Sequence, residues 1–285
     1  MRNIYFLLLS FCLTSCLSTT KNEASIIDKI YVVTLDRTPQ RYEEAKQNLQ
    51  LANLTFSRFS GTDGYNMKVV DKNSSEILNG KEWWNSCKKA QKLGQKLTYE
   101  VYCDNNIENN IQISACPSPG EIGCYCSMRR VWKDILKNNH KYVLILEDDT
   151  KIQKKDLKTF KSQINSLISN TPLNWDVIYL HLHNRNDKLY PARKIHDKTE
   201  NEYVWGINRD PEYSLGSTIA YIVNRSFAEK MYIYSERMNF PIDMQIADAI
   251  NKRVINGYKA KKQLVIVGED SVIDNMGRNK NGILK

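Results

Sequence analysis

Short apolar runs alternate with amphipathic stretches along most of the chain. The first run, Ile30 to Leu35, is hydrophobic apart from one threonine, and such a run is typical of a strand buried on both faces. Pro39 then stands where the first turn of a helix would begin, and residues 41–51 read as that helix. The order strand, turn, helix recurs along the chain, which predicts a mostly parallel sheet.

The same alternation continues after a second helix start. Ser118 and Glu121 flank Pro119 as a capping box, which predicts a long helix from this point. We therefore expect an α/β, Rossmann-like fold with helices on both faces of the sheet. The other predicted strands lie at 56–59, 142–146, 175–180, 217–223 and 264–267, and the other helices at 156–168, 225–232 and 241–257.

Residues 65–117 interrupt this alternation. They are polar, rich in lysine and asparagine, and contain Trp83, Trp84 and three cysteines. We expect this segment to be an insertion or lid on the main domain. The tryptophan pair is interpreted as a small satellite core, with a stacking platform for sugars as the alternative.

The first sixteen residues have the composition of an export signal. Arg2 precedes an apolar run at 4–13 that is too short to cross a bilayer. The sequence Leu-Thr-Ser-Cys, which ends at Cys16, resembles a bacterial lipobox whose cysteine carries the lipid; an ordinary cleaved signal peptide is the alternative. The predicted organisation is a lipoprotein-type signal at 1–16, a polar tether at 17–28, a main domain at 29–275 and a tail at 276–285.

The charge balance bears on partners and location. The formal net charge is +9, and the basic residues are spread along the chain, which predicts attraction to phosphates, nucleotides or acidic headgroups. Without zinc-finger spacing, an RNA-binding aromatic signature or a basic repeat, nucleic acid is not an expected partner. We expect an exported protein held on a membrane surface by its N-terminal lipid, with association at the cytoplasmic face as the alternative.

Seven cysteines occur, and two of them belong to the signal. Five remain, so at least one has no partner within the chain. The chain has no Cys-x-x-Cys pair, so a structural zinc site is not expected. Export would permit disulfides, and the spacing leaves the pairing open. The five are Cys87, Cys103, Cys116, Cys124 and Cys126.

The strongest chemical signal follows the apolar run Val143 to Leu146. Glu147, Asp148 and Asp149 come directly after it, at the edge where open α/β sheets bind ligands. Strand alternation places Glu147 and Asp149 on one side and Asp148 on the other. Two convergent carboxylates fit a divalent cation, Mn²⁺ or Mg²⁺, that bridges a diphosphate. A helix cap or a solvated acidic loop is the alternative.

Further short motifs occur in order along the chain. They are Leu35-Asp36-Arg37-Thr38-Pro39-Gln40-Arg41, Gly61-Thr62-Asp63-Gly64, Pro119 to Cys124, Val131-Trp132, Leu146 to Asp149, Ala220 to Val223, Ala228-Glu229-Lys230 and Pro241-Ile242-Asp243. Together they resemble glycosyltransferase family 25, which includes lipooligosaccharide and collagen galactosyltransferases. The resemblance implies an A-type glycosyltransferase fold. It also implies inverting transfer of galactose or a related hexose from a UDP-sugar to a hydroxyl of a glycan or glycolipid.

The resemblance also implies roles for single residues. Two arginines near a helix start would bind the diphosphate, and an aspartate would deprotonate the acceptor hydroxyl. A solvated turn, a turn aspartate and a helix cap are the alternatives for these groups. His181 and His183 alternate on a strand edge and are interpreted as ordinary histidines. The predicted donor-binding residues are Arg37, Arg41, Asp63, Glu121 and Asp148, the metal ligands Glu147 and Asp149, and the general base Asp243.

One departure from the family pattern leads to a second function class. The family usually has Ser-His where this chain has Ser127 and Met128, and methionine neither donates a hydrogen bond nor carries charge. If that histidine acts on substrate, the change impairs activity; if it packs, the change is mild. The alternative to an enzyme is therefore a non-catalytic exported lipoprotein, with a degenerate transferase fold that serves as a binding module.

Overall fold

The computed structural model describes residues 25–72, 74–95, 99–103, 110–113, 116–181, 204–206 and 217–268. The predicted signal with Cys16, the predicted tail and His183 lie outside the described residues. Within the described part of the chain, no helix is both long and apolar enough to cross a membrane.

Seven strands form the larger sheet. In spatial order they are β10 (Val204–Gly206), β13 (Gly257–Ala260), β9 (Val177–Tyr179), β11 (Ala220–Asn224), β7 (Tyr142–Glu147), β1 (Lys29–Thr34) and β2 (Ser57–Ser60). Five of the seven run in one direction, and β10 and β11 run in the other. The predicted mostly parallel sheet is therefore confirmed.

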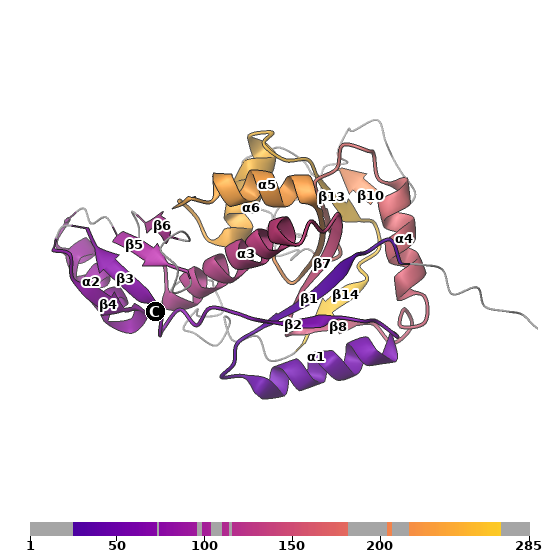
Figure 1. Ribbon diagram of the computed structural model, residues 1–285, viewed down its shortest axis with the longest axis horizontal. Coiled ribbons are helices and arrows are strands. Elements are labelled where there is room, and N and C mark those ends of the chain that lie inside the picture. The colour runs from indigo at the N-terminus through magenta and orange to yellow at the C-terminus, as the bar shows by residue number, and fades with distance from the viewer. Residues whose placement is uncertain are drawn as a thin grey trace, which may run out of the picture.

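Helices cover both faces of this sheet, as predicted (Figure 1). One face carries α1 (Pro39–Leu51) and α4 (Phe160–Asn170), and the other carries α3 (Pro119–Lys137), α5 (Arg225–Tyr234) and α6 (Ile242–Asn251). Successive residues of a strand point to opposite faces. Thus Val32 and Leu144 join the core under α1 and α4, whereas Val33 and Ile145 join the core under α3.

The predicted insertion contributes most of a second, smaller sheet at one end of the molecule (Figure 1), and residues 237–238 add an edge strand to it. Its core is continuous with the core under α3, and Trp83 is fully buried there with its ring edge-on to Tyr99. Trp83 is therefore a core residue, as expected, although the core is not a separate one. The elements are β12 (Arg237–Met238), β6 (Asn110–Ile113), β5 (Tyr99–Tyr102), β3 (Lys68–Asp71) and β4 (Ile77–Asn79), with α2 (Gly80–Lys92).

One prediction near the C-terminal end was wrong. The helix expected at 241–257 ends at Asn251, because Arg253 adopts a left-handed φ of 62° that stops the helix. The chain then enters the larger sheet as β13. The strand expected at 264–267 is confirmed as β14 (Val265–Val267), which pairs with β8 (Thr150–Ile152) in a separate two-stranded ribbon.

One disulfide fastens the insertion to α3, and a second closes a loop within the insertion next to the start of α3. Cys87 in α2 pairs with Cys116 just before α3, and Cys103 after β5 pairs with Cys126 within α3. The bridges span 29 and 23 residues, and the chain-entropy estimate gives about 3–4 kcal/mol of stabilisation for each. Cys124 is a free thiol, which confirms that at least one cysteine has no partner.

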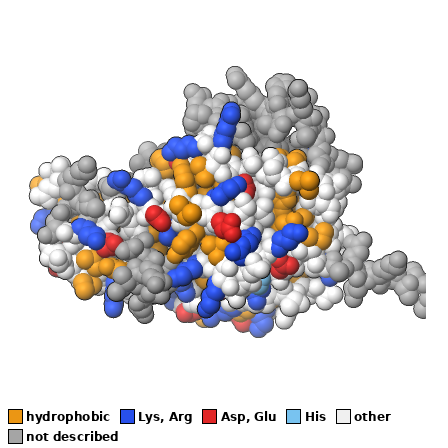
Figure 2. All heavy atoms as spheres, turned by 45° about the horizontal axis from the view of Figure 1, so that its top comes forward, with side chains coloured by type: hydrophobic (Ala, Val, Ile, Leu, Met, Phe, Trp, Pro, Cys, Tyr) orange, Lys and Arg blue, Asp and Glu red, His pale blue; other side chains and the backbone are white. Residues whose placement is uncertain are grey.

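Charge on the surface follows the sequence pattern. On the face shown in Figure 2, lysine and arginine side chains are distributed among apolar and acidic ones and do not form one continuous basic patch. On this face the described basic residues favour general attraction to anions over a single strong docking site.

Glycines let the turn after β2 lie directly on the start of α3. A Cβ on Gly64 would stand 1.7 Å from the Pro119 carbonyl oxygen, and a Cβ on Gly123 would stand 2.7 Å from the Thr62 carbonyl oxygen. Both neighbours are backbone atoms, which do not move aside as a flexible side chain does. Only glycine at these two positions therefore permits the short distance between the turn and the helix.

Gly64→Ala tests this contact. The added methyl forces the turn away from α3, so we expect the free energy of unfolding to fall by roughly 2–3 kcal/mol, measured by urea denaturation of the oxidised protein. Gly94→Ala is the matched control, because a Cβ there meets nothing within 4 Å. Its positive φ costs only about 1 kcal/mol. Equal unfolding midpoints for Gly64→Ala and the wild type would contradict the close packing.

Candidate active site

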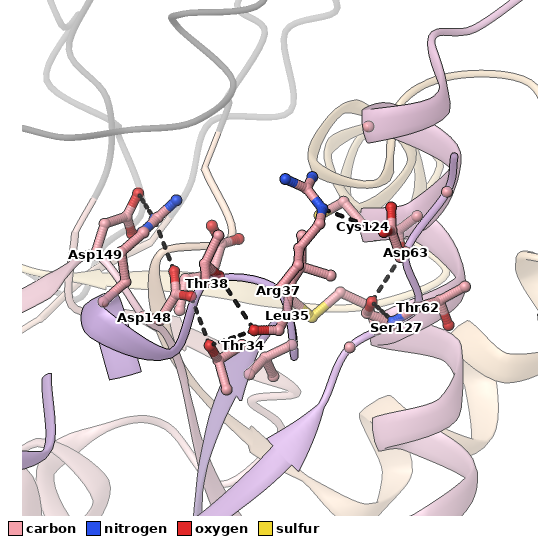
Figure 3. Close-up of a pocket in the computed structure, with 18 of the residues that line it drawn as sticks. Thr34, Leu35, Arg37, Thr38, Thr62, Asp63, Cys124, Ser127, Asp148 and Asp149 are labelled. Atoms are coloured by element: carbon pink, nitrogen blue, oxygen red, sulfur yellow. Dashed lines mark hydrogen bonds and ion pairs between the residues drawn. The ribbon is translucent and has the colours of Figure 1, made fainter. Parts of the chain in front are cut away.

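A pocket opens where the carboxyl ends of three parallel strands meet. Strands β1, β2 and β7 run in the same direction, so the segments that follow them lie at one edge of the sheet (Figure 3). Helices α1 and α3 supply further walls. The lining residues are Val33, Thr34, Leu35, Arg37, Thr38, Arg41, Gly61 to Tyr65, Gly120, Gly123, Cys124, Ser127, Met128, Glu147, Asp148 and Asp149.

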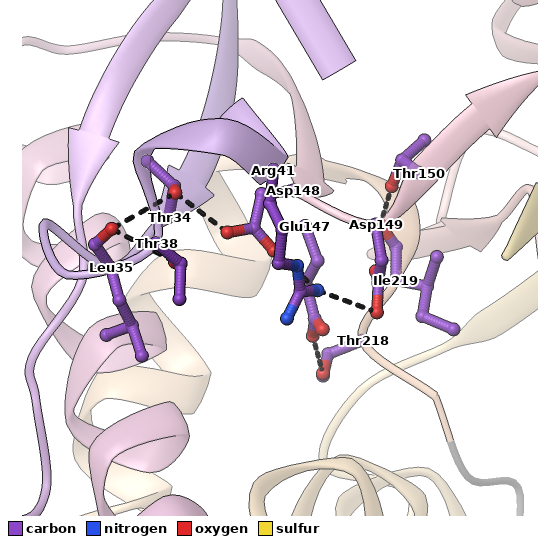
Figure 4. A network of polar contacts seen from close by, with 10 residues as sticks. All are labelled: Thr34, Leu35, Thr38, Arg41, Glu147, Asp148, Asp149, Thr150, Thr218 and Ile219. Atoms are coloured by element: carbon purple, nitrogen blue, oxygen red, sulfur yellow. Dashed lines mark hydrogen bonds and ion pairs between the residues drawn. The ribbon is translucent and has the colours of Figure 1, made fainter. Parts of the chain in front are cut away.

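The acidic cluster, defined here as Glu147, Asp148 and Asp149, lies around Arg41 (Figure 4). Nη2 of Arg41 is 2.7 Å from Oδ1 of Asp148 and 3.1 Å from Oδ2 of Asp149. The Thr34 hydroxyl donates a hydrogen bond of 2.7 Å to Oδ2 of Asp148. Asp148 is thus held by both a cation and a hydroxyl, while Asp149 depends on the guanidinium.

Two polar atoms of this arrangement are buried without a hydrogen-bond partner among the described residues. They are Nε of Arg41 and Oδ1 of Asp149, and the Asp149 side chain is only 7% exposed. A buried polar atom without a partner costs free energy. One unpaired donor and one unpaired acceptor in the same pocket therefore indicate a place for a ligand.

Glu147 has a strongly perturbed acidity. Burial and the neighbouring Asp149 raise the pKa of its carboxyl to about 8, partly offset by a hydrogen bond of 2.5 Å from the Thr218 hydroxyl. Burial also raises the pKa of Asp148 and Asp149, against the opposing effect of Arg41. Three ionised carboxylates would exceed the charge of one guanidinium, and the raised pKa of Glu147 means that a proton on its carboxyl relieves part of this excess at neutral pH.

The predicted alternation of the three carboxylates was wrong. Strand β7 ends at Glu147, and Asp148 and Asp149 form a turn, so the two-residue period of a strand does not extend to them. As a result Asp148 and Asp149 both reach Arg41, and all three carboxylates line the pocket.

The donor set fits a hard divalent cation. In the described part of the chain, no three His, Cys, Asp or Glu side chains are grouped so as to hold a metal by themselves. Ions such as Mg²⁺ at phosphate sites, however, use one or two carboxylates and take the remaining oxygens from phosphate and water. Glu147 and Asp149 supply two carboxylates, and Oδ1 of Asp149 is an oxygen without a partner.

The opposite side of the pocket is built around Asp63. Its carboxylate accepts hydrogen bonds from the Tyr65 backbone N–H at 3.2 Å and the Asn66 amide at 2.9 Å, and it pairs with Nε of Arg37 at 3.2 Å. Figure 3 shows Asp148 on one side of the pocket, Asp63 on the other and Arg37 between them. Asp63 therefore shapes its own turn and also orients an arginine toward the pocket.

Two predicted residues lie outside the pocket lining. The Glu121 carboxylate accepts hydrogen bonds from the N–H and hydroxyl of Ser118 at 2.7 and 2.9 Å, which confirms the capping box. Asp243 lies in the first turn of α6, where its carboxylate accepts from the Met244 N–H at 2.8 Å. Burial raises the pKa of Cys124, a pocket residue, and the charges of Glu147 and Asp243 add to this effect. The functional roles of both stay predictions.

Two polar residues of the site were missed in the sequence. Thr218 reaches Glu147 because β11 is antiparallel to β7, so the start of β11 lies at the carboxyl end of β7. Ser127 accepts a hydrogen bond from the Thr62 N–H at 2.8 Å and thereby holds the turn on α3. His181 was interpreted as ordinary; it is buried, with Nδ1 3.1 Å from the Val265 carbonyl oxygen.

Position 128 is a packing position on the pocket wall. Met128 is 1% exposed, and the Tyr221 hydroxyl donates to its sulfur at 3.2 Å. The thioether therefore sits in the core under α3 while bordering the pocket.

Comparison with known proteins identifies a family for this site. The model of "Glycosyltransferase family 25 (LPS biosynthesis protein)" matches residues 27–246. That range includes the whole pocket lining and the start of α6.

Three curated relatives are similar at low identity. "Probable inactive glycosyltransferase 25 family member 3" of Bos taurus is 24% identical over 82% of this chain. "Inactive glycosyltransferase 25 family member 3" of Homo sapiens is 27% identical over 54%, and "Procollagen galactosyltransferase 1" of Danio rerio is 25% identical over 49%. The matched parts cover only 33%, 21% and 22% of those relatives, so this chain spans a third or less of their length.

Proposed function

This chain belongs to glycosyltransferase family 25, and from that premise we propose that it moves a hexose such as galactose from a UDP-sugar to a hydroxyl of a glycan or glycolipid. The proposal includes metal assistance and inversion at the anomeric carbon. One observation carries it: the acidic cluster and the side chains of Arg37 and Arg41 line a single pocket at the carboxyl edge of the sheet. The name of the zebrafish relative supports galactose as the sugar.

Arg37 and Arg41 are assigned to bind the diphosphate of the donor. Arg41 has an unpaired buried N–H donor, and a guanidinium forms paired hydrogen bonds with phosphate oxygens. The start of α1 adds the positive end of a helix dipole, and Thr38 makes no side-chain cap there. Asp63 is assigned to the uridine or ribose. Glu121 supports the same side by fixing the start of α3.

Glu147 and Asp149 are assigned as ligands of a divalent cation, with Asp148 holding Arg41 beside them. Such a cation, when bound, neutralises the charge that develops on the departing nucleoside diphosphate. The chain itself supplies the oxygen atoms and a largely buried site, where electrostatic attraction is stronger than in water.

Asp243 is assigned as the general base that accepts the proton of the acceptor hydroxyl. In the proposed step the hydroxyl oxygen bonds to the anomeric carbon, its proton passes to the Asp243 carboxylate, and the bond from that carbon to the diphosphate oxygen breaks. A single displacement of this kind inverts the anomeric configuration. Asp243 is well suited because it lies in a first helical turn, partly exposed and in electrostatic reach of the pocket wall at Cys124.

A second candidate function is a non-catalytic binding module with the same fold. Met128 in place of the histidine usual in the family favours it, and so do two relatives whose names include the word inactive. This module would bind UDP in the pocket without transferring or hydrolysing the sugar. Turnover measured on the same preparation that binds UDP separates the two functions.

Asp149→Asn tests the cation site. The substitution keeps size but removes a charged oxygen ligand, so Mn²⁺ should no longer strengthen UDP binding in isothermal titration calorimetry, while the wild type should bind UDP more tightly with Mn²⁺. Asp36→Asn is the matched control, because the Asp36 side chain is 69% exposed and pairs with Arg58 away from the pocket lining. Wild-type Mn²⁺ dependence in Asp149→Asn would remove Asp149 from the site.

Asp243→Asn tests the general base. Loss of the proton acceptor should lower kcat by roughly 10²-fold or more with UDP affinity nearly unchanged. Asp248→Asn is the control on the same helix, since Asp248 contacts Tyr234 and Lys252 instead of the pocket. Normal turnover in Asp243→Asn would show that Asp243 is not the general base and serves only at the start of α6.

The proposed location is an exported protein anchored by lipid at Cys16. The two disulfides support this proposal, because such bonds persist in oxidising compartments. Attachment at the cytoplasmic face remains the alternative, and there the bridging cysteines would be reduced.

Cys16→Ser tests the anchor. We expect the wild type to sediment with membranes in high salt, where electrostatic binding is screened, and Cys16→Ser to be released or left unprocessed. Cys12→Ser is the control within the same segment and should behave as the wild type. Mass spectrometry should find acyl chains on a mature N-terminus at residue 16. An unmodified terminus downstream of Cys16, or an intact Met1, would refute lipidation.

A further inference from the structure

We propose that Arg41 is an internal counter-cation that occupies the acidic cluster until a nucleoside diphosphate draws it away. The divalent cation and the nucleotide then bind cooperatively, and Arg41 is the residue that couples them. This inference rests on the proposed function, because it assigns a second role to a residue of the same donor site.

The coupling begins with competition for the same carboxylates. One nitrogen of Arg41, Nη2, contacts Oδ1 of Asp148 and Oδ2 of Asp149, which leaves Oδ1 of Asp149 for a cation. A divalent ion bound to Asp149 would stand next to the guanidinium, and the two positive charges would repel strongly in a buried site. A cation alone should therefore bind weakly.

The unpaired atoms show what relieves this competition. Nε of Arg41 and Oδ1 of Asp149 are both buried and lack hydrogen-bond partners among the described residues. A phosphate oxygen satisfies the first, and a cation satisfies the second. Neither ligand satisfies both, so the pocket reaches a fully paired state when the two arrive together.

The surroundings allow Arg41 to change partners while two of the three carboxylates stay held. The Thr34 hydroxyl holds Asp148 at 2.7 Å, and the Thr218 hydroxyl holds Glu147 at 2.5 Å. Asp149 loses its ion pair with Arg41, and a divalent cation takes the place of that charge. Arg41 lies in the first turn of α1 and lines the pocket itself. A side-chain rotation is therefore enough to bring it to a diphosphate.

Arg37 differs in this respect, although it lines the same pocket. Its guanidinium pairs with Asp63 across the pocket from the acidic cluster. Its contribution to the diphosphate therefore leaves the cation ligands unchanged, and it provides a control with the same change of charge.

The experiment measures Mn²⁺ binding to the full chain by electron paramagnetic resonance, with and without UDP. Coupling between two ligands is reciprocal and typically amounts to about 5- to 150-fold, so UDP should tighten Mn²⁺ binding to the wild type by a factor in this range. Arg41→Gln should bind Mn²⁺ alone at least about 5-fold more tightly than the wild type, with little further gain from UDP. Arg37→Gln should keep weak Mn²⁺ binding alone and a clear gain with UDP.

A second measurement needs no variant. In thermal unfolding of the wild type, Mn²⁺ and UDP together should raise the Tm by more than the sum of their separate shifts, because ligands that bind cooperatively stabilise the fold cooperatively. The Tm measurement tests the inference even if Arg41→Gln fails to fold. In that case Arg41→Lys is the variant used, and UDP should increase the Mn²⁺ affinity of Arg41→Lys by less than it does for the wild type.

The outcomes separate this inference from the proposed function. Equal Mn²⁺ affinity of Arg41→Gln and the wild type without UDP, or an undiminished gain with UDP in the folded variant, overturns the role of Arg41 alone. Additive Tm shifts in the wild type do the same. A wild type that binds neither UDP nor Mn²⁺ under any combination overturns the proposed function and this inference together.

Discussion

The ion pair between Arg41 and the acidic cluster is the interaction on which this pocket depends. Parallel strands β1, β2 and β7 end at one edge, and that geometry brings three carboxylates into a partly buried space. Removing the cation from such a group typically costs about 3–5 kcal/mol. The acidic cluster therefore needs the positive charge that Arg41 of α1 supplies. Helix α1 lies close enough to supply it because β1, which precedes α1, is the neighbour of β7.

Helix α3 provides the rigid support for the opposite wall. Its start is held by the Ser118 capping box, its Gly123 lies against the turn after β2, and two disulfides bind the insertion to it or to the segment just before it. These constraints are backbone contacts and covalent bonds. The wall that carries Cys124 and Ser127 is consequently fixed, and adjustment in the pocket is left to long side chains such as Arg41. A fixed wall of this kind fits the proposed movement of Arg41, because only one side chain then has to change its place.

The sequence predicted what depends on local chemistry. Pro39 and the capping box at Ser118 mark helix starts that the structure confirms, and the apolar run before Glu147 led correctly to the pocket edge. Features that depend on pairing between distant segments were missed. The antiparallel insertion of β11 beside β7 brings Thr218 to Glu147, and no local pattern encodes a strand's direction. The turn that breaks alternation at Asp148 likewise depends on where β7 stops.

Position 128 stands on a different element from the charged residues that line the pocket. Met128 packs in the core under α3, with its sulfur against the Tyr221 hydroxyl. The charged groups assigned to the donor stand instead on the segments after β1, β2 and β7 and on α1. Loss of a functional group at position 128 therefore leaves the charged part of the pocket intact. Under the proposed assignments, a change on the α3 wall would leave the groups assigned to the nucleotide in place, because those groups stand on other elements.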